Sequence, residues 1–162
     1  MMMENPNRLY ESFSETFPRE RLANPTASEL DALTDLWEAS VRATHDFLAP
    51  EDIPFYRRLV REEALPAATL HVLRDNNGAF AAFAGTEGDK LEMLFVAPTQ
   101  FGKGLGSKLL NYVATHCGVR RVDVNEQNEQ AAKFYARHGF RIVARDAADP
   151  SGRPYPILHL ER

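Results

Sequence analysis

A glycine-rich turn between a predicted strand and a predicted helix is the part of the sequence best suited to chemistry. Glycines alternate at positions 102, 104 and 106. Glycine has no Cβ, so the backbone N–H groups of such a turn can approach an anion closely, and the following helix adds the positive end of its dipole. The turn therefore predicts a pyrophosphate site. Its spacing fits neither a P-loop nor the dinucleotide fingerprint, which needs a glycine where Ser107 stands.

A second segment, residues 122–140, reads as a short strand, a polar turn and an amphipathic helix that ends at a glycine. This segment contains a motif of an asparagine, an alanine, a tyrosine and a Gly-Phe pair, here Asn128, Ala132, Tyr135, Gly139 and Phe140. Together, and in this order, the two segments resemble the GNAT superfamily of acyl-CoA-dependent N-acyltransferases. The local sequence over residues 124–131 is similar to that of small bacterial members, and the resemblance covers about residues 18 to 160.

The resemblance implies a fold and a cofactor. The fold is GNAT-like, α/β (α+β), with a mixed, mostly antiparallel central sheet flanked by helices on both faces. The predicted order of elements also indicates a sheet covered on both faces. The implied cofactor is acetyl-CoA (CoA), with its pyrophosphate in the glycine loop. The residues expected to bind it are Leu94, Phe95, Val96, Phe101, Gly102, Lys103, Gly104, Leu105, Gly106, Ser107, Asn125, Asn128 and Tyr135.

Acetyl transfer needs a neutral amine, a site for the oxyanion and a proton for the departing thiolate. An alkylamine has a pKa of about 10, so a base or a desolvating pocket must help to remove its proton. The resemblance assigns the oxyanion and pantetheine contacts to backbone amides of residues 94–96. Tyr135 is the candidate general acid, because a phenol is protonated at neutral pH and can donate to a thiolate. Taken without the resemblance, a tyrosine packed in the core is the simpler interpretation.

The general base has three candidates. Asp123 precedes the tyrosine helix, and strand alternation points it away from the side on which its neighbours pack. Glu92 precedes the glycine loop, on the face of Leu94. His45 would act through water near neutral pH. Each carboxylate also fits an ordinary solvated strand residue, and a loop histidine fits a simple hydrogen-bonding role.

The acceptor pocket is expected between the first two helices and the last strands. The predicted substrate-binding residues are His45, Phe47, Tyr56 and Tyr155, whose rings suit an apolar or cation-holding slot; the aromatic residues fit a hydrophobic core equally well. Asn125 and Asn128 suit the amide groups of pantetheine, and Asn128 also suits a helix cap.

One position departs from the family pattern. Arginine or glutamine usually stands where this sequence has Phe101, and Gln100 lies immediately before it. Lys103 and Lys108 are the candidates for the missing positive charge. The lysine ammonium is a point charge, however, and does not offer the two parallel N–H donors of an arginine guanidinium.

Composition restricts the class of protein. The 162 residues carry 19 Lys and Arg against 23 Asp and Glu, a net charge of −4, which favours neither a nucleic-acid nor a membrane-surface partner. The single cysteine, Cys117, excludes an internal disulfide and a cysteine metal cage, and no metal is expected. The N-terminus lacks a signal-peptide pattern, so a cytoplasmic location is expected. The expected oligomeric state is a monomer or a homodimer. Residues 1–16 are predicted to be a flexible extension, and residues 17–162 a single GNAT-like domain.

Local patterns place the elements. A capping box over residues 26–29 predicts the start of the first helix, and a second helical stretch runs from Pro50 until Pro66 stops it. Residues 69–74 alternate as a strand, and Asn76-Asn77-Gly78 predicts a type I′ hairpin turn.

The sequence therefore predicts an N-acetyltransferase that moves an acetyl group from acetyl-CoA to a primary amine of a small molecule or peptide. Two alternatives stay open. One is a non-catalytic acyl-CoA sensor or interaction module on the same fold. The other is a nucleotide-binding enzyme with a Rossmann-like loop, in which Asp123 would be the acidic residue after the loop.

Overall fold

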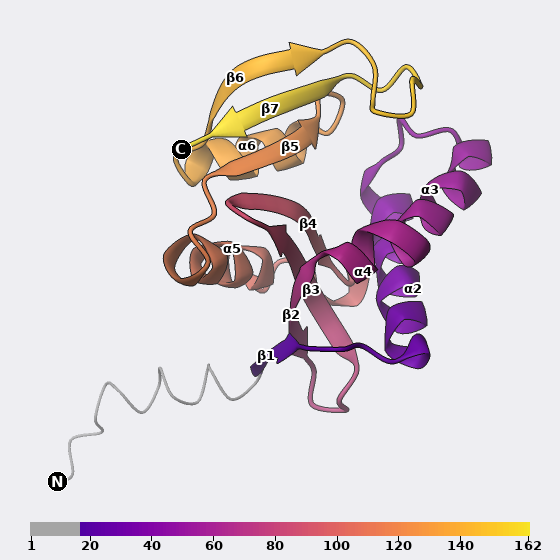
Figure 1. The fold of residues 1–162 in the computed structure, drawn as a ribbon, viewed down its shortest axis with the longest axis vertical. Coiled ribbons are helices and arrows are strands. Elements are labelled where there is room, and N and C mark those ends of the chain that lie inside the picture. Colours follow the sequence, from indigo (N-terminus) through magenta and orange to yellow (C-terminus); the bar gives the residue numbers. More distant parts are fainter. Residues whose placement is uncertain (1–16) are drawn as a thin grey trace, which may run out of the picture.

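A single seven-stranded sheet organises the chain (Figure 1). The structure, a computed structural model, describes residues 17–162, so the expected extension over residues 1–16 lies outside the described part. The strand order is β1-β2-β3-β4-β5-β7-β6. Neighbouring strands are antiparallel except for β4 and β5, which are parallel. The predicted mixed, mostly antiparallel sheet is confirmed.

The elements follow one another along the chain with short connections. The strands are β1 (Arg19–Leu22), β2 (Thr69–Arg74), β3 (Phe80–Glu87), β4 (Lys90–Val96), β5 (Arg121–Asn125), β6 (Arg141–Asp146) and β7 (Ile157–Glu161). The helices are α2 (Ala27–Thr44), α3 (Ile53–Leu59), α4 (Leu65–Ala67), α5 (Leu105–His116) and α6 (Glu129–Arg137), with short turns η1 (Pro50–Asp52), η2 (Val60–Ala64) and η3 (Pro98–Gln100). Within residues 17–162, no helix is long and apolar enough to cross a membrane.

Two hydrophobic clusters cover the two faces of the sheet. On one face, Leu109 and Val113 of α5 pack with Ala84 of β3 and Val122 of β5. On the other face, Leu33 and Trp37 of α2 pack with Phe83 and Met93. Residues that alternate along the strands thus reach opposite cores, as the pleat requires. Helices lie on both faces, as predicted.

The turn between β2 and β3 is not the predicted type I′ turn. That type needs a positive φ at both Asn77 and Gly78. Gly78 has a φ of 79°, whereas the only non-glycine residue with a positive φ in the described part is Asn24. The Asp75 carboxylate accepts hydrogen bonds from the N–H groups of Asn77 and Ala79. The Gly78 N–H donates to the Asp75 carbonyl at 3.0 Å, so the turn is centred one residue earlier than expected.

Two further boundaries differ from the sequence prediction. Strand β1, which pairs antiparallel with β2, was not predicted, because it has only four residues and no clear alternation. Pro66 does not stop the second helical stretch, because it lies inside α4, which continues to Ala67. The wide π-helical turn η2 precedes it, and the chain leaves the helix only at Ala68.

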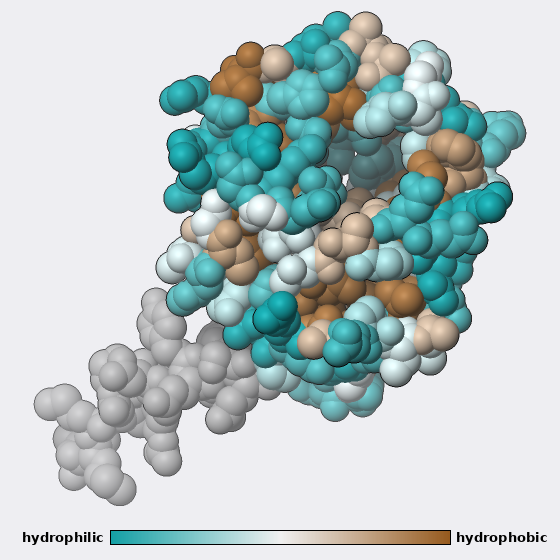
Figure 2. Space-filling view, in the orientation of Figure 1, coloured by the Kyte–Doolittle hydropathy of each residue, from teal (hydrophilic) through white to brown (hydrophobic). Residues whose placement is uncertain are grey.

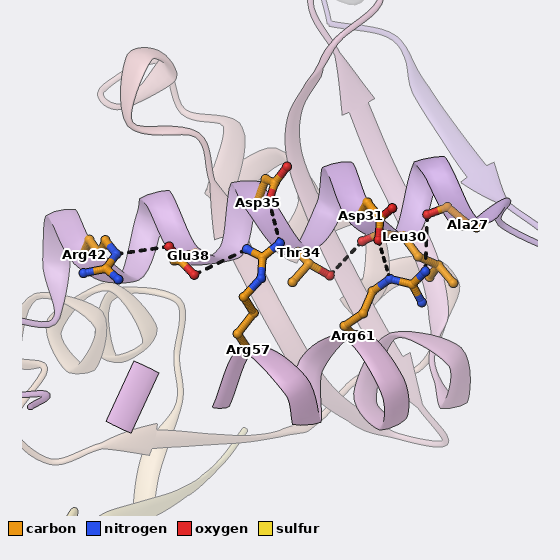
Figure 3. A network of polar contacts seen from close by, with 9 residues as sticks. All are labelled: Ala27, Leu30, Asp31, Thr34, Asp35, Glu38, Arg42, Arg57 and Arg61. Carbon is orange, nitrogen blue, oxygen red and sulfur yellow. Dashed lines mark hydrogen bonds and ion pairs between the residues drawn. The ribbon is translucent and has the colours of Figure 1, made fainter. Parts of the chain in front are cut away.

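Ion pairs dock α3 and η2 along the side of α2 (Figure 3). Arg57 contacts Asp35 at 2.7 Å and Glu38 at 3.3 Å, and Arg61 contacts Asp31 at 2.7 Å. Such exposed pairs contribute little free energy singly. Together with the apolar contacts beneath them they fix the direction of α2, whose C-terminal end reaches the candidate site.

The capping box at the start of α2 is confirmed and generates a stability prediction. Thr26 Oγ1 accepts from the Glu29 N–H at 3.1 Å, and Glu29 Oε1 accepts from the Thr26 N–H at 2.9 Å. Thr26→Ala should lower the free energy of unfolding by about 1 kcal/mol, measured by urea denaturation. Ser28→Ala is the control, because the Ser28 side chain is exposed in the same first turn of α2. This substitution should change the free energy of unfolding by less than about 0.5 kcal/mol. Equal losses in both variants would contradict the role of the cap.

Candidate active site

The glycine turn leads into the N-terminus of α5 without a side-chain cap. Gly102 and Gly104 adopt positive φ angles of 78° and 76°, which other residues adopt only with strain. Gly104 is the N-cap residue, so no side chain accepts from the first N–H groups of the helix. The amides of Leu105, Gly106 and Ser107 therefore remain free, because the first intrahelical bond is donated by Lys108. Free amides and the helix dipole together favour an anion here.

Strands β4 and β5 separate soon after they begin. Their parallel pairing is limited to Lys90 with Arg121 and Leu91 with Val122, and beyond these residues β4 is paired on one side only. The Ala97 N–H donates to Ala81 on the β3 side at 2.8 Å. Because successive residues of a strand direct their N–H groups to opposite sides, the amides of Leu94 and Val96 face the gap, and that of Phe95 faces β3.

A cavity of about 650 Å³ occupies the gap and continues from the glycine turn to the end of α2. Figure 2 shows the surface hollowed between the C-terminal strands and the α2–α3 side of the molecule. The cavity brings most of the predicted site residues together. Those that line it are His45, Glu92, Leu94, Phe95, Val96, Phe101, Gly102, Gly104, Leu105, Gly106, Ser107, Asp123, Asn125, Asn128 and Tyr135. Lys103, Phe47, Tyr56 and Tyr155 are not part of this lining.

Tyr135 lines the cavity from α6. Its ring is buried and meets Phe134 and Phe140 edge-on, with centroids 5.1 and 5.6 Å away. Burial raises the pKa of the Tyr135 phenol, so the hydroxyl keeps its proton. This hydroxyl has no hydrogen-bond partner among residues 17–162 and is not one of their buried unpaired atoms, which leaves it open to the cavity. Asn128 caps α6, because its Oδ1 accepts from the Ala131 N–H at 3.2 Å.

The two candidate carboxylates lie beside a lysine. Lys90 Nζ is 2.8 Å from an Asp123 oxygen and 3.8 Å from a Glu92 oxygen. Asp123 points away from its neighbours, which are buried in the α5 core, as alternation predicts. The expected face of Glu92 was wrong. A bulge makes Glu92 the extra residue of β4, so that Leu91, and not Glu92, shares the α5 face with Leu94.

His159 on β7 completes this polar cluster. Its Nδ1 is 2.7 Å from Asp123 and its Nε2 is 2.7 Å from Asp146. Carboxylates only accept, so both ring nitrogens must carry protons. The bonds to Asp146 and Asp123 accordingly raise the pKa of His159. No signal in the sequence indicated this residue, because the three positions meet only through strand pairing.

The end of the cavity at which the acceptor was expected is lined by Ser40, Thr44 and His45 at the C-terminus of α2. His45 Nδ1 lies 2.7 Å from Thr44 Oγ1. Burial lowers the pKa of His45 to about 4, against an opposing effect of Asp46. His45 is therefore neutral near pH 7. Its role as a base stays a prediction.

The predicted aromatic residues connect two parts of the chain. The Tyr155 hydroxyl donates to Asp52 and accepts from the Ala49 N–H at 3.0 Å. The Tyr56 hydroxyl donates to Asp149. Phe47 packs between the rings of His45 and Tyr155, at centroid distances of 5.1 and 6.3 Å. In this structure these hydroxyls bind protein partners that join η1 and α3 to the β6–β7 loop.

Similar proteins agree with this arrangement. A sequence model of the acetyltransferase (GNAT) domain matches residues 66–142. Peptidyl-lysine N-acetyltransferase YjaB from Escherichia coli (strain K12) is 37% identical over 132 residues, which are 82% of this chain and 89% of YjaB. The chain belongs to the GNAT family. It is an acyltransferase with N-acetyltransferase activity.

Solved GNAT structures share the fold. The solution structure of apo YjaB from Escherichia coli has a TM-score of 0.77 at 34% identity, covering 90% of this chain and 96% of that chain. PaiA N-acetyltransferase from Thermoplasma acidophilum, in complex with coenzyme A, has a TM-score of 0.66 at 18% identity, covering 90% and 99%. The Rossmann-like alternative was wrong, because only one strand pair among residues 17–162 is parallel.

The departure at Phe101 leaves this GNAT loop with few cations. Phe101 is 43% exposed at the rim of the cavity. Lys103 is not part of the cavity lining, and its Nζ donates to Gln100 Oε1 at 2.7 Å. Lys108 Nζ donates to the Phe17 carbonyl at 2.7 Å, so it is not free to replace the missing charge. Within the loop itself the anion site therefore depends mainly on backbone amides, and Arg137 of α6 is a cation that lines the same cavity.

The contacts of His159 with Asp123 and Asp146 should make the stability of the protein depend on pH. The pKa of His159 is higher in the folded than in the unfolded protein. Its contribution to stability is therefore complete at pH values below the unfolded-state pKa, and it is lost as the pH rises through the folded-state pKa. His159→Gln should therefore be less stable than the wild type at about pH 5.5, and the difference should shrink by about pH 9, in urea denaturation at both pH values.

The control is His116→Gln, since His116 is exposed and has no carboxylate partner among the described residues. A pH-independent difference for His159→Gln would show that the charge of the ring is unimportant.

Proposed function

We propose that the chain transfers the acetyl group of acetyl-CoA to a primary amine, most simply the side-chain amine of a peptidyl lysine. The observation that carries the proposal is the single cavity between β4 and β5. It joins the free amides of α5, the unpaired edge of β4, Tyr135 and two carboxylates. The name of YjaB, a peptidyl-lysine N-acetyltransferase, supports the choice of amine. Residues 17–162 would act as one GNAT-like domain.

In this proposal the free amides at the start of α5 hold the CoA pyrophosphate. Gly102 and Gly104 place no side chain in the way, since a Cβ built on either meets nothing within 4 Å. Asn125 and Asn128 line the same cavity and offer amide groups to pantetheine. The GNAT fold of the coenzyme A complex from Thermoplasma acidophilum supports this use of the cavity.

The unpaired edge of β4 serves the thioester. The amides of Leu94 and Val96 face the gap and have the chemistry of an oxyanion site, where donors fixed in advance stabilise developing negative charge. The amine attacks the carbonyl carbon, the new C–N bond forms and the C–S bond breaks. Asp123 or Glu92 takes the proton that the amine must lose, directly or through water.

Tyr135 is proposed as the general acid for the departing thiolate. Its open hydroxyl and its placement in the cavity support this role. Because burial raises the pKa of the phenol, Tyr135 stays protonated and donates a hydrogen bond before the sulfur takes up a proton. Tyr135 gives its proton to the thiolate and regains one from water, while the carboxylate releases to water the proton that it took from the amine. Both groups are thus restored at the end of each turnover.

Gly104→Asp tests the anion site. A side chain here strains a backbone with φ of 76° and brings a negative charge to the free amides, so acetyl-CoA binding should be lost in titration calorimetry. Gly78→Asp is a matched control, because Gly78 has a φ of 79° in a turn that is not part of the cavity lining. It should bind acetyl-CoA as the wild type does. Normal binding by Gly104→Asp would refute the assignment of the loop.

Tyr135→Phe tests the general acid. It should lower kcat by about a hundredfold and change the acetyl-CoA Kd less than about twofold, because only a donor to the leaving group is lost. Tyr112→Phe on α5 is the control, since Tyr112 lies outside the cavity lining. Steady-state kinetics with a lysine peptide gives kcat, and calorimetry gives Kd. An unchanged kcat for Tyr135→Phe would remove Tyr135 from the mechanism.

A further inference from the structure

The hydrogen bonds at the end of α2 determine which nitrogen of His45 carries the proton. Thr44 Oγ1 donates to the Ser40 carbonyl at 2.8 Å. A hydroxyl has only one proton, so with that proton donated to the Ser40 carbonyl, Thr44 Oγ1 accepts in its 2.7 Å contact with His45 Nδ1. In this arrangement the proton of the neutral imidazole lies on Nδ1, and Nε2 carries a lone pair.

Nε2 is available to a ligand. It has no hydrogen-bond partner among the described residues, and it is not a buried unpaired atom, a class that holds only His71 Nδ1 in residues 17–162. The ring lines the cavity at the C-terminus of α2 and packs against Phe47 at a centroid distance of 5.1 Å. The structure thus presents one oriented acceptor atom in a partly buried place.

The ring is also uncharged. Burial lowers the pKa of His45 to about 4, so the imidazole accepts hydrogen bonds at neutral pH without carrying a positive charge that would repel an amine. The nearby carboxylates of Glu92 and Asp123 line the same cavity and are suited to take the proton. His45 would thus accept a hydrogen bond from the amine, and one of the two carboxylates would remove its proton.

We infer that His45 binds the acceptor amine through Nε2, and that Thr44 is the positioning residue that fixes the required tautomer. A primary amine has two N–H groups and one lone pair. A hydrogen bond from one N–H to Nε2 leaves the lone pair free to attack the thioester carbon. The inference rests on the proposed function, in which the cavity admits an amine.

Kinetics with Nα-acetyl-lysine amide as acceptor tests both residues. His45→Phe keeps an aromatic ring without an acceptor, and Thr44→Val removes the hydroxyl that fixes the tautomer. Each should raise the acceptor KM about tenfold, the worth of one hydrogen bond, with the acetyl-CoA Kd changed less than about twofold. Thr44→Ser should restore the wild-type KM. Unchanged acceptor KM values in both His45→Phe and Thr44→Val would overturn the inference.

Nitrogen-15 NMR of the histidine rings gives a readout that packing alone would not change. The wild type should show His45 protonated on Nδ1, and Thr44→Val should show a mixture of tautomers. Adding Nα-acetyl-lysine amide with CoA, which cannot transfer an acetyl group, should shift the Nε2 signal of His45 and leave His71 unchanged. No shift of Nε2 would overturn the inference even in an active enzyme. A shift without acetylation by the wild type would instead refute the proposed function and support the amine site.

Discussion

The early end of the pairing between β4 and β5 is the constraint on which the site depends. Hydrogen bonding between these strands stops after Leu91 and Val122, and the bulge at Glu92 changes the faces of the residues that follow. A continuous sheet would have paired the amides of Leu94 and Val96 with β5. Their separation leaves donors unpaired and opens the cavity, while the cores on both faces keep the strands in place.

Unpaired backbone groups supply much of the chemistry that the cavity offers. The start of α5 lacks a side-chain cap because glycine stands at the N-cap, and the edge of β4 lacks a neighbouring strand. Both features would be costly in a closed core, where buried N–H groups need partners. Here they face a space suited to a pyrophosphate and a thioester. This use of the backbone fits a loop in which Phe101 replaces the usual polar residue and Lys108 bonds elsewhere.

Local signals in the sequence were sufficient for the features formed by neighbouring residues. The capping box of α2, the glycine turn before α5 and the cap at Asn128 were predicted because each depends on a few consecutive residues. The bulge at Glu92 and the cluster at His159 were not predictable, since both arise from the register between strands distant in sequence. The tautomer of His45 was equally inaccessible, because it depends on which group already bonds to Thr44.

The contacts of Tyr155 with Asp52 and of Tyr56 with Asp149 have a mechanical consequence. The two parts of the sheet are joined at Lys90 and Leu91, and these tyrosine contacts connect them again through η1, α3 and the β6–β7 loop. The cavity thus lies between two parts of the protein that are connected on both of its sides, by the β4–β5 pairing and by the tyrosine contacts. Its width is set when the protein folds, so little of the binding free energy of a ligand has to be used to close the two parts around it.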